Sequence, residues 1–416
     1  MDTSASAAHA AVETAHQSYG RLIAYLAARS GDVAGAEDAL SEAFLAALQR
    51  WPADGVPDKP EAWLLHAARN RLIDAARRQQ TREEAAERLR IIAEEAETAA
   101  AAAGPFPDER LALLFVCAHP AIDPAARSPL MLQTVLGVEA ARIASAFLVS
   151  PAAMGQRLVR AKQKIREARI PFRVPEPQEW HERAADVLDA IYAAYTTGWE
   201  SILESGATHH ALAAEAIILG RTLAALMPQE PEAAGLLALM LHCEARRDAR
   251  FSEDGAFVPL DRQDPARWSR PLIGEAEAHL RQASAMGKPG RYQLEAAIQS
   301  IHAHRAVTGV IDWREILLLY EGLVRTAPGI GSLAGRAVAL AQCGQPAAGL
   351  AALDEIPPAR VVTYQPWWAA RGHLLKLLDR PDEAAAAFIR AASLTDDSAL
   401  RRHLFHCAAE CRLTRP

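Results

Sequence analysis

The sequence lacks the features that mark membrane, secreted and disulfide-bonded proteins. No apolar run reaches the roughly 18 residues that a membrane helix needs. The first residues contain neither a basic segment nor an apolar one, so we expect no secretory signal. The five cysteines are an odd number and form no Cys-x-x-Cys pair, which argues against a disulfide framework. We therefore expect a cytoplasmic protein without a membrane partner.

Signatures of catalysis and of metal binding are also missing. The sequence has no phosphate-binding GxxxxGK[ST] loop and no pairing of a nucleophile with a base. His403 and Cys407 are spaced by one helical turn, but no second ligand pair with zinc spacing accompanies them. We therefore expect a protein that is not an enzyme and that uses no metal and no cofactor.

Patterns typical of β-strands are scarce. Aromatic residues make up only 6% of the chain, and alternating apolar runs are rare. Apolar residues instead recur at helical spacing almost throughout, and alanine is abundant. With 416 residues, half of them hydrophobic, the chain is long enough for two or three domains. The sequence predicts an all-α protein.

Prolines, glycines and composition divide the chain into four segments. A helical block is followed by a segment rich in Ala and Glu, and then by a second block that ends in the proline-rich stretch 171–177. The remainder is a long array of helices. The predicted boundaries are 11–80 for the first domain, 81–104 for a linker helix, 105–173 for the second domain and 180–416 for the array.

The C-terminal array contains a possible repeat. Pro346 and Pro381 each follow a turn and begin a predicted helix, and they are 35 positions apart. This spacing is close to the tetratricopeptide period of about 34 residues. Two copies are also compatible with helical hairpins in general. We predict a tetratricopeptide-like array of helical hairpins.

The net charge of −6 is distributed unevenly. Residues 151–173 carry seven Lys or Arg and a single Glu. The first 173 residues are neutral in sum, so the whole negative excess belongs to the remainder. An acidic total counts against nucleic-acid binding, but here it hides a strongly basic segment.

The basic segment has the layout of a helix-turn-helix. A short helix with Ile143 and Phe147 turned inward precedes a turn at 148–150, and Ser150 suits the N-cap of a second helix that begins at Pro151. Such a helix would enter the major groove and meet phosphates with its later basic residues. A solvated basic face of an ordinary helical hairpin is the other interpretation. The apolar side of the second helix is predicted at Met154, Leu158 and Ile165.

Two further amphipathic segments precede the basic one. Residues 60–78 combine an apolar side with a basic face that can bind bases and phosphates, or that is simply solvated. Residues 36–51 carry acidic residues near the helix start, where the helix dipole favours them, and fit either a structural role or a protein interface. The apolar stripe of that helix is predicted at Leu40, Phe44, Ala47 and Leu48.

These three segments, in this order, resemble a bacterial RNA polymerase sigma factor of the extracytoplasmic-function (ECF) group of the sigma-70 family. Residues 36–50 are similar to the family pattern A-E-D-x-x-Q-E-[TA]-F, with Ser41 at the position of the glutamine. Residues 62–78 match A-W-L-x-x-I-A-R-N-x-x-[IL]-D-x-x-R-R at most positions, and residues 157–165 match R-L-x-R-A-[RK]-x-x-[LI].

The chain departs from the family at two places near the third segment. Leu148 occupies a turn position that often holds glycine, and residues 117–137 are longer than the family's compact helix. With the C-terminal array included, the chain is similar to the ECF subgroup that carries a C-terminal tetratricopeptide-like extension.

The resemblance implies a sigma region 2 helical bundle at 11–80 and a region 4 helix-turn-helix domain at 105–173. The linker would thread the polymerase between them. The residues implied to recognise the minus-ten promoter element are Arg69, Asn70, Arg71, Asp74, Arg77 and Arg78, with Trp63 in the core. Those implied to bind the minus-thirty-five element are Ser150, Ala153, Met154, Gln156, Arg157, Arg160, Lys162 and Lys164. Those implied to bind core polymerase are Glu37, Asp38, Ser41, Glu42, Phe44 and Gln49.

The expected function is promoter-specific initiation of transcription. The partners implied are promoter DNA and core RNA polymerase, through its β′ clamp helices and its β flap. The helical array would regulate the factor or bind a regulatory protein or peptide. The alternative is a helical-repeat scaffold whose sigma-like part no longer functions. Two basic faces at family spacing, which a scaffold has no reason to keep, favour the sigma factor.

Overall fold

The computed structural model describes residues 3–78, 109–147, 149–176, 179–180, 183–200 and 206–413. These residues form α-helices joined by turns and short 3-10 segments. Within the same ranges no β-strand occurs, and a single bridge pairs Phe251 with Phe257. The predicted all-α fold is therefore confirmed. The predicted linker helix at 81–104 and the turn residue Leu148 lie outside the described residues.

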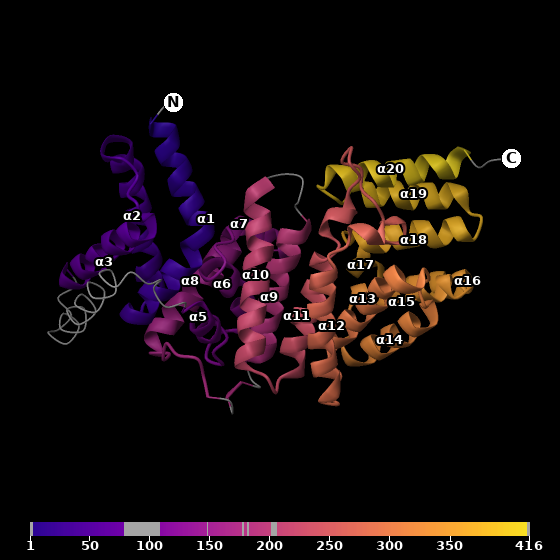
Figure 1. The fold of residues 1–416 in the computed structure, drawn as a ribbon, viewed down its shortest axis with the longest axis horizontal. Helices are drawn as coiled ribbons and strands as arrows, with labels where there is room; N and C mark the ends of the chain where they lie inside the picture. Colours follow the sequence, from indigo (N-terminus) through magenta and orange to yellow (C-terminus); the bar gives the residue numbers. More distant parts are fainter. Residues whose placement is uncertain are drawn as a thin grey trace. The chain divides into compact units, whose positions relative to one another are not determined.

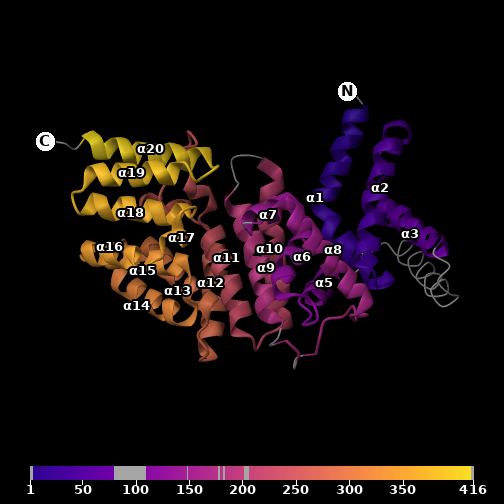
Figure 2. The same cartoon turned by 180° about the vertical axis from the view of Figure 1, so that it is seen from behind.

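The chain divides into two units, of which the first comprises residues 1–198 and 210–219. Helix α1 packs on α2, α3, α5 and α6, and α8 packs on α2, α6 and α7 (Figures 1 and 2). The helices of this unit are α1 (Thr3–Ser30), α2 (Val33–Asp54), α3 (Pro60–Arg78), α5 (Arg110–Cys117), α6 (Pro124–Thr134), α7 (Ala140–Ala146), α8 (Pro151–Glu167), most of α9 (Ala184–Glu200) and the middle of α10 (Gly206–Leu226).

The second unit comprises residues 199–209 and 220–416. Most helices in this unit pack on the next helix along the chain, and α11 also contacts α13, while α18 contacts both α15 and α16. The α-helices that follow α10 are α11 (Pro231–Glu244), α12 (Arg270–Ala285), α13 (Arg291–Thr308), α14 (Trp313–Thr326), α15 (Ile330–Gln342), α16 (Pro346–Asp354), α17 (Pro358–Val361), α18 (Gln365–Leu377), α19 (Pro381–Ala392) and α20 (Ser398–Leu413).

Local chemistry explains the helix boundaries at the N-terminal end. Gly31 has a positive φ of 68°, a conformation that glycine adopts without steric cost, and it ends α1. Asp32 then caps α2 by accepting a hydrogen bond from the Gly35 amide at 3.1 Å. The helix predicted over residues 36–51 continues through Pro52 to Asp54, because a proline near a helix end removes only one backbone hydrogen bond.

The core of the first unit is centred on α5. Every residue of this helix is buried, including Arg110, whose guanidinium forms an ion pair with Glu215 of α10. A second ion pair joins Arg127 of α6 to Asp186 of α9 at 2.7 Å. A buried cation is tolerated only when it is paired, so these two contacts fix where α9 and α10 lie against α5 and α6.

The C-terminal helices form hairpins of similar construction. Pro346 and Pro381 are the first residues of α16 and α19, as the sequence predicted. Before each of them, a residue with positive φ, Gly344 at 84° and Asp379 at 54°, reverses the chain after α15 and α18. Their assignment to the tetratricopeptide class stays a prediction.

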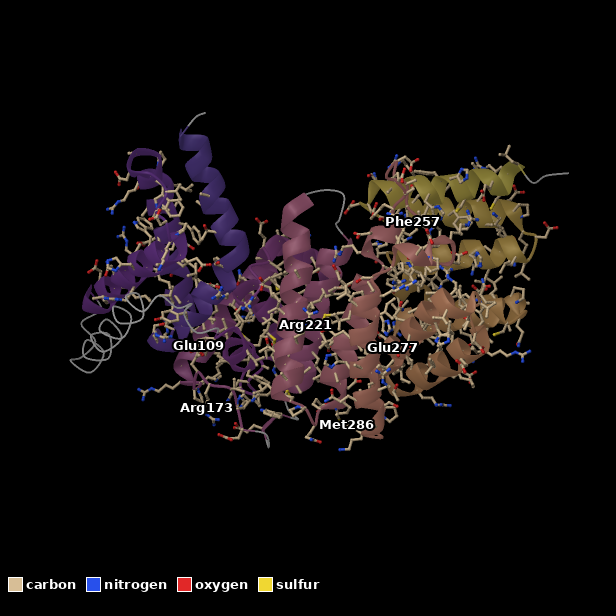
Figure 3. The ribbon with its side chains drawn as sticks, in the orientation of Figure 1. Glu109, Arg173, Arg221, Phe257, Glu277 and Met286 are labelled. Atoms are coloured by element: carbon tan, nitrogen blue, oxygen red, sulfur yellow. The ribbon has the colours of Figure 1, made fainter. Side chains whose placement is uncertain are left out.

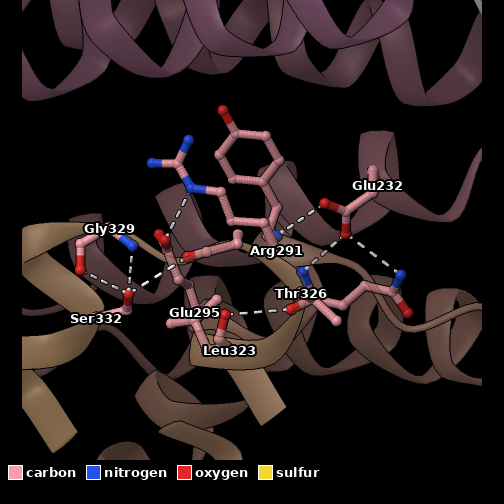
Figure 4. A network of polar contacts seen from close by, with 10 residues as sticks. Glu232, Arg291, Glu295, Leu323, Thr326, Gly329 and Ser332 are labelled. Carbon is pink, nitrogen blue, oxygen red and sulfur yellow. Dashed lines mark hydrogen bonds and ion pairs between the residues drawn. The ribbon is translucent and has the colours of Figure 1, made fainter. Parts of the chain in front are cut away.

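A carboxylate of α11 caps the start of α13 (Figure 4). Glu232 accepts hydrogen bonds from the amide of Tyr292 at 2.8 Å and from the amide of Gln293 at 3.1 Å. The close approach of Glu232 to α13 needs glycine at two positions. A Cβ on residue 290 would lie 2.3 Å from the Glu232 Cδ, and a Cβ on residue 235 would lie 2.8 Å from the Gln293 amide nitrogen, so only Gly290 and Gly235 leave enough room. Glu232 thus replaces the local side-chain cap that Gly290 cannot supply.

None of the helices in the described ranges has both the length and the apolarity that a membrane crossing requires. The five cysteines are free thiols.

Candidate nucleic-acid and polymerase interfaces

The predicted helix-turn-helix is formed by α7, the following turn and α8. Ser150 caps α8, its Oγ accepting a hydrogen bond from the Ala153 amide at 3.2 Å, and Pro151 is the first helical residue. This is the cap that the sequence indicated. Phe147, predicted to turn inward, is instead exposed, because α7 ends at Ala146 and Phe147 already belongs to the turn.

One side of α8 is apolar and buried. Met154, Leu158, Ala161 and Ile165 recur every three or four residues along this side, in a helix that packs on α2, α6 and α7. Met154 is 0% exposed, so the prediction that it contacts DNA is corrected: it is a core residue, because position 154 falls on the same helical face as Leu158.

The opposite side of α8 is exposed and basic. Gln156, Arg160 and Lys164 are exposed, as is Ala153 in the first turn. Arg157 is half-buried and donates a hydrogen bond to the Ala125 carbonyl oxygen at 3.2 Å. The freely exposed cations of the predicted set are therefore Arg160 and Lys164, each able to reach a phosphate.

Lys162 lies on a third side of α8, where it contacts α2. Its ammonium forms an ion pair with the Glu37 carboxylate, and the two side chains are only 11% and 14% exposed. Nearby, Arg166 lies 3.7 Å from the Asp32 carboxylate. Lys162 and Glu37, predicted for DNA and for polymerase respectively, are thus bound to each other in this structure.

Burial also shifts proton affinities around this pair. Desolvation raises the pKa of Glu37, and Lys162 opposes the shift by stabilising the carboxylate. Desolvation likewise raises the pKa of Tyr19, with further contributions from Glu37 and Asp38. Burial raises the pKa of the Cys117 thiol to about 12, so this cysteine stays protonated and unreactive.

The exposed surface of α2 combines acidic and apolar side chains. Of the predicted polymerase contacts, Phe44 is half-buried, and the exposed ones are Asp38, Ser41, Glu42 and Gln49. Leu48 was predicted to be buried, but it is 43% exposed, and the neighbouring Leu45 is 59% exposed.

Leu45 and Leu48 were missed as candidate interface residues. For Leu45 the signal was present in the sequence, because a residue five positions after Leu40 falls off the helical side that Leu40 marks. Leu48, eight positions after Leu40, falls near that side, so periodicity alone did not predict its exposure. Two exposed leucines one turn apart, bordered by polar residues, are typical of a protein-binding surface.

Helix α3 contributes the predicted minus-ten surface. Leu64 and Ala68 are buried, and Trp63 packs edge-on against Trp51 with ring centroids 5.6 Å apart. Arg69 is half-buried, whereas Asn70 and Asp74 are exposed.

Arg71 links this surface to α2. Its guanidinium lies 3.2 Å from the Glu42 carboxylate, with about half of each side chain exposed to solvent. Such an exposed pair contributes about 0–1 kcal/mol and exchanges readily for another partner. Arg77 and Arg78 belong to the last turn of α3, and their side chains lie outside the described set.

In the described part of the chain, no group of three or more His, Cys, Asp or Glu residues is placed to hold a metal ion. His403 and Cys407 do face each other on α20, with Nε2 and Sγ 3.5 Å apart, but they form a pair without further ligands.

Comparison with known proteins identifies two regions of the chain. Residues 15–82 match the family model of sigma-70 region 2, a span that contains the α2 and α3 surfaces. Residues 183–284 match a family of unknown function, DUF6596. An uncharacterized protein of Rhizobium meliloti (strain 1021) is 40% identical over 410 residues, which cover 96% of each chain. No solved structure matches.

Proposed function

This chain belongs to the same family as the Rhizobium meliloti protein and is a sigma-70 family factor, and from that premise we propose that it is an ECF-group factor that directs promoter-specific transcription initiation. The observation that carries the proposal is the region 2 match over two helices with complementary surfaces. One surface, on α2, is acidic and apolar, and the other, on α3, is basic and polar.

We infer that α2 docks on the clamp helices of the polymerase β′ subunit. Leu45 and Leu48 supply apolar area at the centre of the contact, and Asp38, Glu42 and Gln49 supply its polar rim. Helix α3 then faces the minus-ten element, where Asn70 can read base edges and Arg71 can exchange Glu42 for a phosphate.

We infer that α8 reads the minus-thirty-five element through its exposed side. Gln156 lies in the second turn, where recognition helices meet bases, and Arg160 and Lys164 follow at one-turn intervals towards the phosphates. Since α2 is assigned to the polymerase and α8 to DNA, the proposal includes opening of the Lys162–Glu37 pair when the holoenzyme assembles.

The C-terminal hairpins are proposed to form a tetratricopeptide-like module that regulates the factor or binds a regulatory protein or peptide. Support comes from the repeated plan of α15–α16 and α18–α19, each with a positive-φ residue followed by proline. Stacked helical hairpins present extended surfaces that suit such partners.

Binding to polymerase is tested by co-elution of the full chain with purified core enzyme. Substituting both Leu45→Glu and Leu48→Glu should abolish co-elution, because charge is placed in the apolar centre of the contact. The matched control is Val307→Glu on α13, which also replaces an exposed apolar residue and should leave co-elution intact. Equal co-elution of all three proteins would remove α2 from the interface.

Promoter-directed initiation is tested by run-off transcription with core polymerase and pooled genomic fragments from the organism that supplies both proteins. Discrete transcripts that depend on the full chain are expected. Suppose that the protein co-elutes with core polymerase but that neither the full chain nor a form lacking residues 180–416 produces a transcript. The sigma-factor role would then be wrong, and the helical-repeat scaffold would be the remaining function.

A further inference from the structure

A cavity lies in the second unit between α11, α12, α13 and the segment that leads into α12. The cavity is small, because the centre of a water-sized guest can occupy only about 10 Å³ of it, and it is partly open to solvent. Glu277 of α12, labelled in Figure 3, contacts the lining residue His242. The polar residues of its lining are His242, Arg246, Trp268, Gln299 and His302.

The segment that forms one wall is held firmly in place. Arg305 of α13 donates hydrogen bonds to the carbonyl oxygens of Asp261 at 2.6 Å, Gln263 at 2.8 Å and Leu260 at 3.1 Å. Its guanidinium also lies 5.1 Å from the centre of the Trp268 ring. The backbone of this wall therefore has its carbonyl groups satisfied by the protein itself.

Several side chains that line the cavity, unlike the backbone of this wall, have polar atoms without hydrogen-bond partners. Neither ring nitrogen of His242 has a hydrogen-bond partner, although the side chain is only 1% exposed. The Trp268 Nε1, the His302 Nδ1 and the Arg246 Nε are likewise buried without a hydrogen-bond partner. Four side chains that line the cavity, from three parts of the chain, thus carry buried nitrogen atoms without a hydrogen-bond partner, and buried polar atoms normally have partners.

The charges around the cavity restrict what can enter. Arg246 is a permanent cation whose Nη2 is held by the Gln299 Oε1 at 2.6 Å. The Glu277 carboxylate lies 3.5 Å from the His242 Nε2, and it also accepts a hydrogen bond from Ser300. The indole and guanidinium nitrogens can only donate, so a complementary guest must accept hydrogen bonds and gains from negative charge.

We propose that this cavity is a binding site for the oxyanion group of a small molecule, a carboxylate or a phosphate. Arg246 and Trp268 donate to its oxygens, and His242 and His302 donate through whichever ring nitrogen faces it. The apolar side chains of Leu260 and Ile273 border the remainder of the guest. This inference is independent of the role in transcription.

The residues around the cavity disfavour further positive charge. Burial lowers the pKa of His302 to about 4, and Arg246 and Arg305 add to the shift. Burial lowers the pKa of His242 to about 4, where Arg246 adds to the shift and Glu277 opposes it. An anion placed among these groups raises both pKa values, so its binding takes up protons and strengthens as the pH falls.

The test is titration of the full chain with sodium acetate or sodium phosphate, at constant ionic strength maintained with chloride. Binding is followed by calorimetry and by the rise in Tm. We expect saturable binding of at least one probe, with higher affinity at about pH 6 than at about pH 8. Acetate and phosphate separate a carboxylate ligand from a phosphate ligand.

Variants assign the binding to this cavity. Trp268→Phe removes one donor and keeps the ring, and we expect it to weaken binding by about tenfold. Arg246→Gln should weaken it further. Trp368→Phe removes an indole N–H that donates to the Val361 carbonyl oxygen elsewhere in the unit, and it should bind the probe like the original chain. The proposal is overturned if neither probe binds saturably. It is also overturned if Trp268→Phe and Arg246→Gln bind the probe as tightly as the Trp368→Phe control does.

Discussion

At the scale of single residues, Lys162 and Glu37 illustrate the cost of burying charge. Each side chain is largely removed from solvent, and each is stabilised there mainly by the other. Taking one partner away leaves an ion in a medium that solvates it poorly. The pair therefore specifies how α8 lies on α2 more than it adds to stability.

We predict that Glu37→Gln lowers the free energy of unfolding by about 2–4 kcal/mol, because Lys162 then remains buried without its counter-charge. The double variant Glu37→Gln, Lys162→Met should regain most of this loss. Urea denaturation of the three proteins measures the effect. As a control, Glu42→Gln breaks the exposed pair with Arg71 and should cost at most about 1 kcal/mol. If the double variant loses as much free energy of unfolding as Glu37→Gln alone, the two residues do not stabilise each other as a pair.

Two buried histidines predict how stability depends on pH. His242 and His302 have folded pKa values of about 4, against 6.5 for an ordinary histidine. Between these values the unfolded chain binds more protons than the folded one, so stability falls as the pH drops from about 6.5 to about 4. The contribution of His302 is up to about 3 kcal/mol over this range.

The variant His302→Gln should flatten that dependence, whereas His304→Gln, at an exposed neighbouring position, should leave it unchanged. Urea midpoints measured at several pH values provide the comparison. Identical pH profiles for the original chain and His302→Gln would exclude His302 as a source of the dependence.

At the scale of helices, the contact between α11 and α13 depends on small residues at defined places. The Glu232 carboxylate reaches the first turn of α13 because Gly235 and Gly290 leave room for it. Negative charge at a helix start also interacts favourably with the helix dipole. Two elements separated along the chain thus share one cap.

We predict that Glu232→Ala destabilises the protein by about 1–3 kcal/mol, since it leaves amide groups of α13 without an acceptor. Glu232→Gln retains an acceptor oxygen and should cost less. The matched control is Glu355→Ala, at an exposed position beyond the end of α16. Thermal denaturation ranks the variants, and equal losses for Glu232→Ala and Glu355→Ala would contradict the capping role.

Helix α8 shows which features the sequence could predict. Its start was predictable because the cap at Ser150 and the proline at 151 act locally, and its buried row followed from helical periodicity. The pairing of Lys162 with Glu37 was not predictable, because it depends on how two helices 125 residues apart pack. The same limit explains Leu48, whose exposure is decided by which helices pack on α2 and not by residue type. The burial of Met154, by contrast, followed from the period, because position 154 belongs to the predicted apolar row.

At the scale of the whole molecule, charge is separated along the chain. The basic residues of α8 belong to a first part that is neutral in sum, and the acidic excess lies beyond residue 173. Because residues 1–173 carry no net charge, long-range electrostatic attraction adds little to their affinity for DNA. Promoter affinity is then expected to come from a few defined phosphate contacts within the holoenzyme.

We predict that Arg160→Ala and Lys164→Ala each reduce the slope of log affinity against log salt by about one, because each removes one phosphate contact. Promoter binding by the holoenzyme, measured at several salt concentrations, tests this. The control is Arg325→Ala on α14, an exposed arginine outside the first unit, and its slope should not change. Unchanged slopes for Arg160→Ala and Lys164→Ala would assign DNA binding to another helix.

The Glu232 cap also sets an order for events during synthesis. Glu232 is made 60 residues before Tyr292, the first of its donors. At a ribosomal rate of about 5–20 residues per second, the carboxylate waits for about 3–12 s before α13 can receive it. A nascent chain paused within that interval exposes α11 with its acceptor unoccupied, so α11 completes its packing only after translation has passed α13.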